Sequence, residues 1–211
     1  MLVVLSSATG QPITVEEVKQ QLRIESTLDD QLIESYIDIS RRLLENKLGR
    51  TLLPTQYKLI RSNFPGSTHP IELPKPPLLS STGTTSADAT STSLSIMFYK
   101  DSTITNDAIY MSVTAYALDT GELMPKVYPI RDNEWPSSYT TDKKDAVQIT
   151  YWAGYPSRDK VPEPLKHWMK MKVGALYEIR EAFSMRDFNP NRLEHEFFDG
   201  LLDPYIVIKV L

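Results

Sequence analysis

The segment that most constrains the fold is residues 28–49, LDDQLIESYIDISRRLLENKLG, a strongly amphipathic stretch of 22 residues. At about 100° per residue, its apolar side chains fall on one half of a helical wheel. These are Leu32, Ile33, Tyr36, Ile37, Ile39, Leu43, Leu44 and Leu48. Charged residues occupy the other half, namely Glu34, Asp38, Arg41, Arg42 and Glu45. The pattern predicts a helix with one buried face, which needs an apolar partner elsewhere in the chain.

Signals for both ends of this helix are present in the sequence. Thr27 or Asp29 is suited to cap the first turn, and the acidic pair Asp29 and Asp30 complements the positive end of the helix dipole. Gly49 can adopt the left-handed conformation that ends a helix. A shorter helix is predicted to begin after Thr14, because Glu17 follows three residues later in a capping-box arrangement.

A second long helix is predicted after Pro162 and Pro164, where an apolar stripe runs over about five turns. Its members are Leu165, Trp168, Met169, Val173, Leu176, Ile179 and Phe183. This stripe is the natural partner of the first long helix. A further short helix is expected over residues 192–202, ended by Pro204.

The middle of the chain favours β-structure, since most of the 15 prolines lie there and the apolar runs are short. Strands are expected at residues 56–61, 71–73, 94–99, 109–113, 127–130 and 147–152. Residues 80–93 contain ten Ser or Thr in fourteen, which predicts an exposed hairpin tip, a mobile loop or a solvated spacer.

Together these segments predict an α+β protein that is mainly helical, with an antiparallel helical bundle built from both ends of the chain and a β-rich insertion in the middle. The expected division is an N-terminal arm at 1–13, a bundle at 14–50 with 157–204, an insertion at 51–156 and a C-terminal tail at 205–211. The arm is expected to be extended or simply frayed.

Composition and motifs argue against several classes of protein. No apolar run approaches the roughly 20 residues of a membrane span, and MLVVLSS lacks the features of a signal peptide, so the protein is expected to be cytoplasmic at synthesis. With no cysteine, disulfides and thiolate metal sites are excluded. Clustered glycines before a lysine and a Gly-x-Ser-x-Gly elbow are both missing. We therefore predict no catalytic residue, no metal and no cofactor.

Three local sequence patterns each allow two interpretations. The segment from His195 to Asp199 superficially resembles a zinc-protease helix, but Asp199 stands where a second histidine is needed. The lysines at 160, 166, 170 and 172 suit either phosphate contact or a solvated helix face, and the latter is favoured. The tail is rich in β-prone aliphatic residues. It is either a closing strand of the chain's own sheet or a segment that binds another subunit.

Several segments, taken in order, resemble the small head-tail connector proteins of long-tailed bacteriophages. They are residues 12–19 (PITVEEVK), 22–24 (LRI), 29–33 (DDQLI), 48–50 (LGR), 71–78 (IELPKPPL), 135–136 (WP), 149–155 (ITYWAGY), 161–166 (VPEPLK) and 201–205 (LLDPY). The resemblance spans nearly the whole chain, although each segment alone is weakly specific. The Ser/Thr-rich stretch and residues 206–211 do not match it.

The resemblance implies a non-enzymatic homo-oligomeric ring, commonly a dodecamer, that docks on the portal of a DNA-filled head and receives the stopper or tail. The implied location is the head-tail junction of the virion, after assembly in the host cytoplasm. Double-stranded DNA would pass through without specific binding, which suits a net charge of −4 per subunit.

Two sets of contact residues follow from this hypothesis. The charged half of the first long helix would make subunit contacts or line the channel. The tail would bind the portal through Tyr205, Ile206, Val207, Ile208, Lys209, Val210 and Leu211. The alternative is a monomeric ligand-binding or tail-associated module that uses Trp135, Tyr139 and Trp152 in the β-rich middle.

Overall fold

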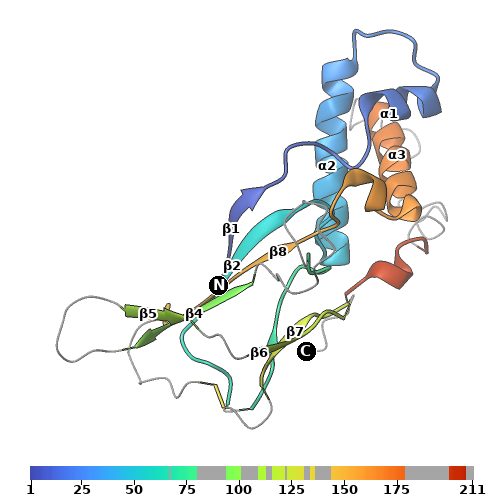
Figure 1. Ribbon diagram of the computed structural model, residues 1–211. Helices are drawn as coiled ribbons and strands as arrows, with labels where there is room; N and C mark the ends of the chain where they lie inside the picture. Colours follow the sequence, from blue (N-terminus) through green and yellow to red (C-terminus); the bar gives the residue numbers. More distant parts are fainter. Residues whose placement is uncertain are drawn as a thin grey trace, which may run out of the picture. The chain divides into compact units, whose positions relative to one another are not determined.

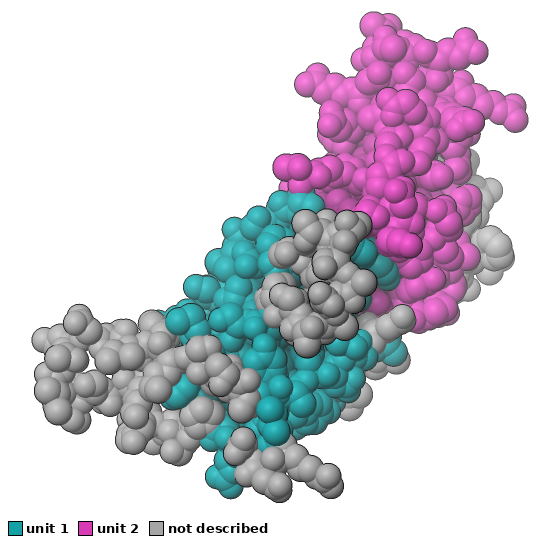
Figure 2. All heavy atoms as spheres, in the orientation of Figure 1, with its two compact units in different colours: residues 1–8, 54–156 teal, residues 9–53, 157–211 magenta. Residues whose placement is uncertain are grey.

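The computed structural model describes residues 1–66, 68–79, 94–100, 109–112, 116–121, 123–130, 134–135, 144–178 and 200–207. Within these ranges the chain contains three α-helices and eight β-strands, so the α+β class is confirmed (Figure 1). The chain divides into two compact units (Figure 2). Unit 1 comprises residues 1–8 and 54–156, and unit 2 comprises residues 9–53 and 157–211.

Unit 1 is built from two antiparallel sheets. The first has five strands in the order β1-β2-β8-β4-β5. Its strands are β1 (Leu2–Ser7), β2 (Thr55–Arg61), β8 (Val147–Ala153), β4 (Ser95–Lys100) and β5 (Ile109–Ser112). The second has three strands in the order β3-β7-β6. These are β3 (Ile71–Glu72), β7 (Lys126–Pro129) and β6 (Tyr116–Asp119).

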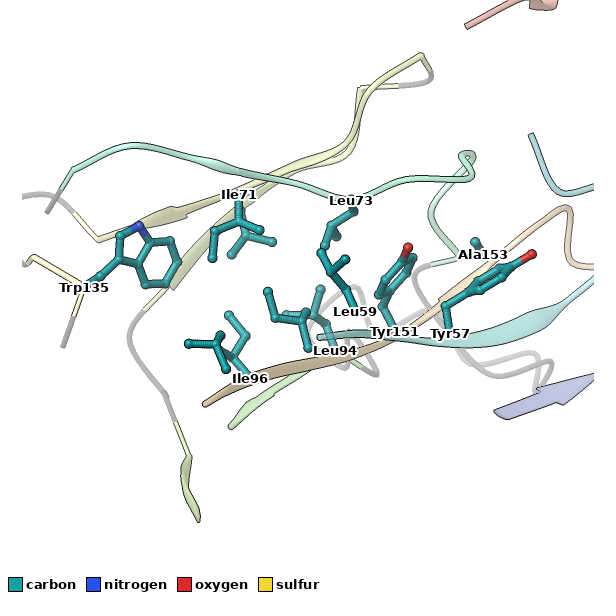
Figure 3. Close-up of a cluster of buried hydrophobic side chains, with 12 residues drawn as sticks. Tyr57, Leu59, Ile71, Leu73, Leu94, Ile96, Trp135, Tyr151 and Ala153 are labelled. Atoms are coloured by element: carbon teal, nitrogen blue, oxygen red, sulfur yellow. The ribbon is translucent and has the colours of Figure 1, made fainter. Parts of the chain in front are cut away.

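The core of unit 1 lies between the two sheets (Figure 3). Buried and half-buried residues alternate along β2 and β8, as expected for strands with only one face in the core. Tyr57, Ile149 and Tyr151 of the large sheet belong to the same buried cluster as Ile71 and Val127 of the small one. The Tyr151 hydroxyl donates to the Pro74 carbonyl oxygen at 2.7 Å, so this buried polar atom is satisfied.

Unit 2 contains the three helices, α1 (Val15–Leu22), α2 (Asp30–Leu48) and α3 (Glu163–Glu178). Helix α1 approaches α3 so closely that a Cβ at Gly174 would lie 3.0 Å from the Leu22 Cδ2 atom. Lys19 Nζ of α1 pairs with Asp30 Oδ1 of α2 at 2.7 Å. Two short 3₁₀ helices complete the described part of this unit, η1 (Arg158–Lys160) and η2 (Asp203–Tyr205).

The predicted ends of the helices are largely confirmed. Gly49 follows α2 with φ of +69°, and the capping box of Thr14 and Glu17 begins α1. Asp29 occupies the N-cap position of α2 but makes no capping hydrogen bond through its side chain. Its Oδ2 atom instead accepts a hydrogen bond of 2.6 Å from the Tyr177 hydroxyl of α3. A tertiary contact therefore replaces the local one.

The predicted buried face of α2 is only half correct. Ile33, Ile37, Leu44 and Leu48 are buried, together with Ser40, whose hydroxyl donates to the Ile37 carbonyl oxygen. Ile39 and Leu43 are instead 43% and 44% exposed, and Leu32 and Tyr36 are half-buried. The apolar half of the helix is wider than the surface that the rest of unit 2 covers.

Two further differences concern the ends and the middle of the chain. Residues 2–7, expected as an arm, form strand β1 and pair with β2. Strand β6 was not predicted.

The finer description of a mainly helical chain with an antiparallel bundle is not established, because strands contribute so much of the described structure. The stretch 80–93 and most of the helix expected at 192–202 lie outside the described residues.

We expect Thr14→Ala to lower the free energy of unfolding by about 1 kcal/mol. Thr14 Oγ1 accepts from the Glu17 N–H at 3.2 Å, and Glu17 Oε2 accepts from the Thr14 N–H at 3.0 Å. The substitution removes the first of these bonds and leaves a helix-end donor without its cap. Urea unfolding followed by circular dichroism measures the effect. Thr14→Ser keeps the hydroxyl and should behave like the wild type; equal losses in both variants would contradict the capping role.

Candidate partner-binding surfaces

The charged residues predicted on α2 do not form one free surface. Asp38 is their centre: its Oδ1 atom accepts from Gln11 Nε2 at 3.3 Å and from Arg41 Nη2 at 3.0 Å. The other carboxylate oxygen, Oδ2, accepts from Arg42 Nε at 2.8 Å. The structure thus brings three of the predicted residues together in one network that also holds the segment before α1.

Glu45 has a separate role at the end of α2. Its Oε1 atom accepts a hydrogen bond of 2.9 Å from the backbone N–H of Leu52, in the segment that leaves the helix. Glu34 is exposed, and the side chain of Arg42 is 70% exposed. Much of the charged half of α2 therefore acts within the subunit, and only Glu34 and Arg42 are turned mainly to solvent.

The environment of Asp38 favours its ionised form. Burial raises the pKa of this carboxyl, but the hydrogen bonds from Gln11 and Arg41 and the charges of Arg42 and Arg41 together hold the pKa below its ordinary value. A carboxyl whose pKa is depressed by folding stabilises the folded state above the unfolded pKa. That contribution is lost as the pH falls through the folded pKa.

Asp38→Asn is therefore expected to be less stable than the wild type at pH 7, with a difference that shrinks as the pH falls through the depressed folded pKa of Asp38. The loss should stay below about 1 kcal/mol, because the carboxylate is 33% exposed and solvent screens its ion pairs. Urea unfolding at a series of pH values from 7 down to 3 tests this. A difference in unfolding free energy that does not change with pH would show that the charge of Asp38 is not what stabilises the fold.

The first three residues of the predicted portal-binding tail are held by unit 2 itself. Arg50, only 2% exposed, donates from Nε to the Tyr205 carbonyl oxygen at 2.6 Å. The backbone N–H of Val207 donates to the carbonyl oxygen of Leu48 at 3.0 Å. Tyr205, Ile206 and Val207 are half-buried, and Ile208, Lys209, Val210 and Leu211 lie outside the described residues.

Reasoning from the sequence did not predict the contact between Arg50 and the C-terminal segment. The position of Arg50 directly after the helix-ending Gly49 was a weak signal, because it places a cation near the carbonyl oxygens at the end of a helix. Its partner stands 155 residues further on, so no local pattern could reveal the contact. We call residues 48–50 with residues 205–207 the tail clasp.

The aromatic residues of the alternative hypothesis do not form a common site. Trp135 is 4% exposed, and its ring stacks on Phe64 with centroids 5.2 Å apart and planes 8° from parallel. Trp135 Nε1 also donates to the His69 carbonyl oxygen at 2.7 Å. Trp152 is half-buried, and Tyr139 lies outside the described residues. The Trp135 ring is part of the buried core of unit 1. It is therefore not available to bind a ligand, and the ligand-binding hypothesis loses its main support.

An open hollow of about 620 Å³ is present elsewhere in unit 1. It is lined by Met1, Ile60, Arg61, Ser62, Lys144 and Asp145. The Met1 amino group at this hollow donates one hydrogen bond to the Ile60 carbonyl oxygen at 2.8 Å. None of the three aromatic residues lines this hollow.

The lysines of the basic cluster differ in their surroundings. Lys166 is buried on α3, and its Nζ atom pairs with Glu163 Oε1 at 2.8 Å. This hydrogen bond lowers the pKa of the Glu163 carboxyl. Lys160 is exposed, and Lys170 and Lys172 are half-buried. The cluster is thus not a continuous phosphate-binding surface.

Within the described ranges, no group of three or more His, Cys, Asp or Glu side chains is placed to hold a metal ion. His195 and Asp199 lie outside those ranges. The helices among the described residues are too short or too polar to cross a membrane.

Comparisons with known proteins support the resemblance noted from the sequence. Residues 12–76 match the profile of the family described as "Phage gp6-like head-tail connector protein". This segment contains α1, α2 and β2, and it holds the charged residues of α2 and Arg50. The resemblance to phage head-tail connector proteins is therefore confirmed. No curated protein matches the chain significantly.

Solved structures extend the likeness over the whole chain. The match to a chain in "Neck of empty GTA particle computed with C6 symmetry" has a TM-score of 0.72 at 16% identity and covers 100% of this chain and 97% of the other. Chains in "Virion of native gene transfer agent (GTA) particle" and "Neck of native GTA particle computed with C12 symmetry" each match with a TM-score of 0.70 at 17% identity and the same coverage. At this identity the likeness establishes a shared fold.

Proposed function

We propose that this chain, which resembles phage head-tail connector proteins, is a structural subunit of the neck of a phage-like particle. In this proposal copies of the chain form a ring, taken here as a dodecamer, between the portal and the stopper or tail. The observation that carries it is the full-length likeness of fold to chains of neck structures, combined with the family match over residues 12–76. The protein acts by assembly and has no enzymatic role.

The charge of the chain suits a channel for DNA. Each subunit carries a net charge of −4, so twelve subunits carry twelve times −4, or about −48. A ring of this sign repels the phosphate backbone and allows double-stranded DNA to pass without being held. In this arrangement the helices of unit 2 provide contacts between subunits.

The tail clasp suggests how the portal would be reached. Residues 205–207 are fixed to the end of α2, so residues 208–211 begin from a defined point on unit 2. We propose that Ile208, Lys209, Val210 and Leu211 contact the portal, and that Tyr205, Ile206 and Val207 serve mainly as their anchor. The protein would meet the portal in the host cytoplasm and remain at the head-tail junction of the virion.

Electron microscopy of particles produced without this gene tests the proposed function directly. We expect heads that package DNA but lack tails or leak their contents, alongside complete free tails. Restoring the gene should restore joined particles. Normal infectious particles in the absence of the gene would refute a connector role.

Two truncated chains distinguish the proposed anchor, residues 205–207, from the proposed portal contact, residues 208–211. A chain ending at Val207 keeps the tail clasp, so it should unfold like the wild type but fail to bind purified portal. A chain ending at Pro204 should in addition lose stability, because Arg50 and Leu48 lose their partners. Wild-type portal binding by the chain ending at Val207 would show that residues 208–211 are not the contact.

A further inference from the structure

Helix α2 carries a second apolar line beside its buried one. It consists of Leu32, Tyr36, Ile39 and Leu43, which we call the outer stripe. Their spacings of four, three and four residues place them in one row along the helix, as in the seam of a coiled coil. The row extends over about 16 Å at a rise of about 1.5 Å per residue.

The outer stripe lies on a different flank of α2 from Glu34, Asp38, Arg41, Arg42 and Glu45; Lys47, four residues after Leu43, marks its C-terminal end. At about 100° per residue, the centre of the stripe is about 110° from the line of Ile33, Ile37 and Leu44, and nearly opposite Glu34 and Glu45. The core of unit 2 covers the first line completely. The outer stripe is left partly in solvent, with Ile39 43% and Leu43 44% exposed.

Single exposed apolar residues are common on protein surfaces, but an aligned row is not. Leu28, just before α2, is 92% exposed and adds to the apolar surface near its start. Two carboxylates of the charged flank are already bound within the subunit, since Asp38 binds Gln11, Arg41 and Arg42, and Glu45 binds Leu52, which leaves mainly Glu34 and Arg42 exposed. Of the two flanks of α2, the apolar one would be stabilised more by a partner, because binding would bury its exposed apolar surface.

We infer that the outer stripe is covered by a neighbouring copy of this chain, an inference that rests on the proposed function. The chains of similar fold come from neck structures described with six-fold and twelve-fold symmetry. In a cyclic ring, each copy contacts its two neighbours through two different surfaces. Centres of such interfaces are poor in charge and rich in aromatic and aliphatic side chains, as this stripe is. It thus replaces the charged residues as the main subunit contact of α2.

The absence of cysteine allows a clean test, because a single introduced thiol reports on one position. Ile39→Cys and Leu43→Cys are compared with Glu34→Cys, a matched control on the opposite flank of the same helix. Each variant is labelled with a maleimide as a dilute monomer and again in the assembled ring with portal. We expect labelling at positions 39 and 43 to slow by about tenfold or more in the ring, as for a buried thiol. Labelling at position 34 should not change.

A second variant, Leu43→Asp, tests whether the contact is needed. Position 43 is 44% exposed in the subunit, so the folded monomer should tolerate the charge, which circular dichroism checks. Sedimentation should then show monomers where the wild type forms rings. Ring formation by Leu43→Asp, or protection at position 34 with none at 39 and 43, would overturn the inference while leaving the proposed function intact. A wild type that forms no ring, even with portal, would refute the proposed function itself.

Discussion

Trp135→Ala should lower the free energy of unfolding of unit 1 by about 3–5 kcal/mol, the largest effect that we expect from a single substitution. The side chain is 4% exposed, so its removal leaves a large cavity in the core between the two sheets. It also removes the stacking partner of Phe64 and leaves the His69 carbonyl oxygen without its 2.7 Å hydrogen bond. Urea unfolding followed by circular dichroism measures this loss without depending on tryptophan fluorescence.

Two control variants separate the causes of this effect. Trp135→Phe keeps an aromatic ring for Phe64 but removes the indole N–H, so about 1–3 kcal/mol of the loss should remain. Trp152→Ala removes the same type of side chain from a half-buried position on β8 and should cost clearly less than Trp135→Ala. If Trp135→Ala cost under about 1 kcal/mol, Trp135 would not be a core residue, and the ligand-binding alternative would regain its support.

Arg50→Met should lower the free energy of unfolding by about 1.5–3 kcal/mol and loosen the C-terminal segment. Methionine fills much of the same volume but cannot donate to the Tyr205 carbonyl oxygen, which accepts from Arg50 Nε at 2.6 Å. Without that bond, the neighbouring hydrogen bond from Val207 to Leu48 should open more often. Faster hydrogen exchange in a peptide that covers residues 205–207 is the specific readout.

The matched control is Arg42→Met, which makes the same substitution on α2, eight residues before Arg50. Its side chain is 70% exposed, so the loss of its ion pair with Asp38 should cost under about 1 kcal/mol. Exchange at residues 205–207 should then remain as in the wild type. If Arg50→Met also left this exchange unchanged, Arg50 would not hold the tail, and the proposed path to the portal would lose its anchor.

Elements that are specified by local patterns were predictable from the sequence. The limits of α2 follow from its periodicity and from Gly49, and the start of α1 follows from the capping box of Thr14 and Glu17. Strands β2 and β8 follow from their alternation of side chains. Each of these signals lies within a few residues of the structure that it specifies, so no knowledge of the rest of the fold is needed.

Elements that need a distant partner were not predictable in the same way. Residues 2–7 could be an arm or a strand, and only pairing with β2, about fifty residues later, makes them β1. β6 likewise depends on its pairing with β7. The role of Arg50 depends on Tyr205, at a separation of 155 residues.

The sequence by itself determined that α2 has one apolar half and one charged half. Only the tertiary structure decided how each half is used. The apolar half is wider than the surface that unit 2 covers, so Ile39 and Leu43 remain exposed. Asp38 is turned inward to Gln11, in a segment outside its own helix. A helical wheel shows on which side of one helix each side chain lies. Whether that side chain is buried depends on which other elements pack against that side of the helix, and the packing of the whole unit decides this.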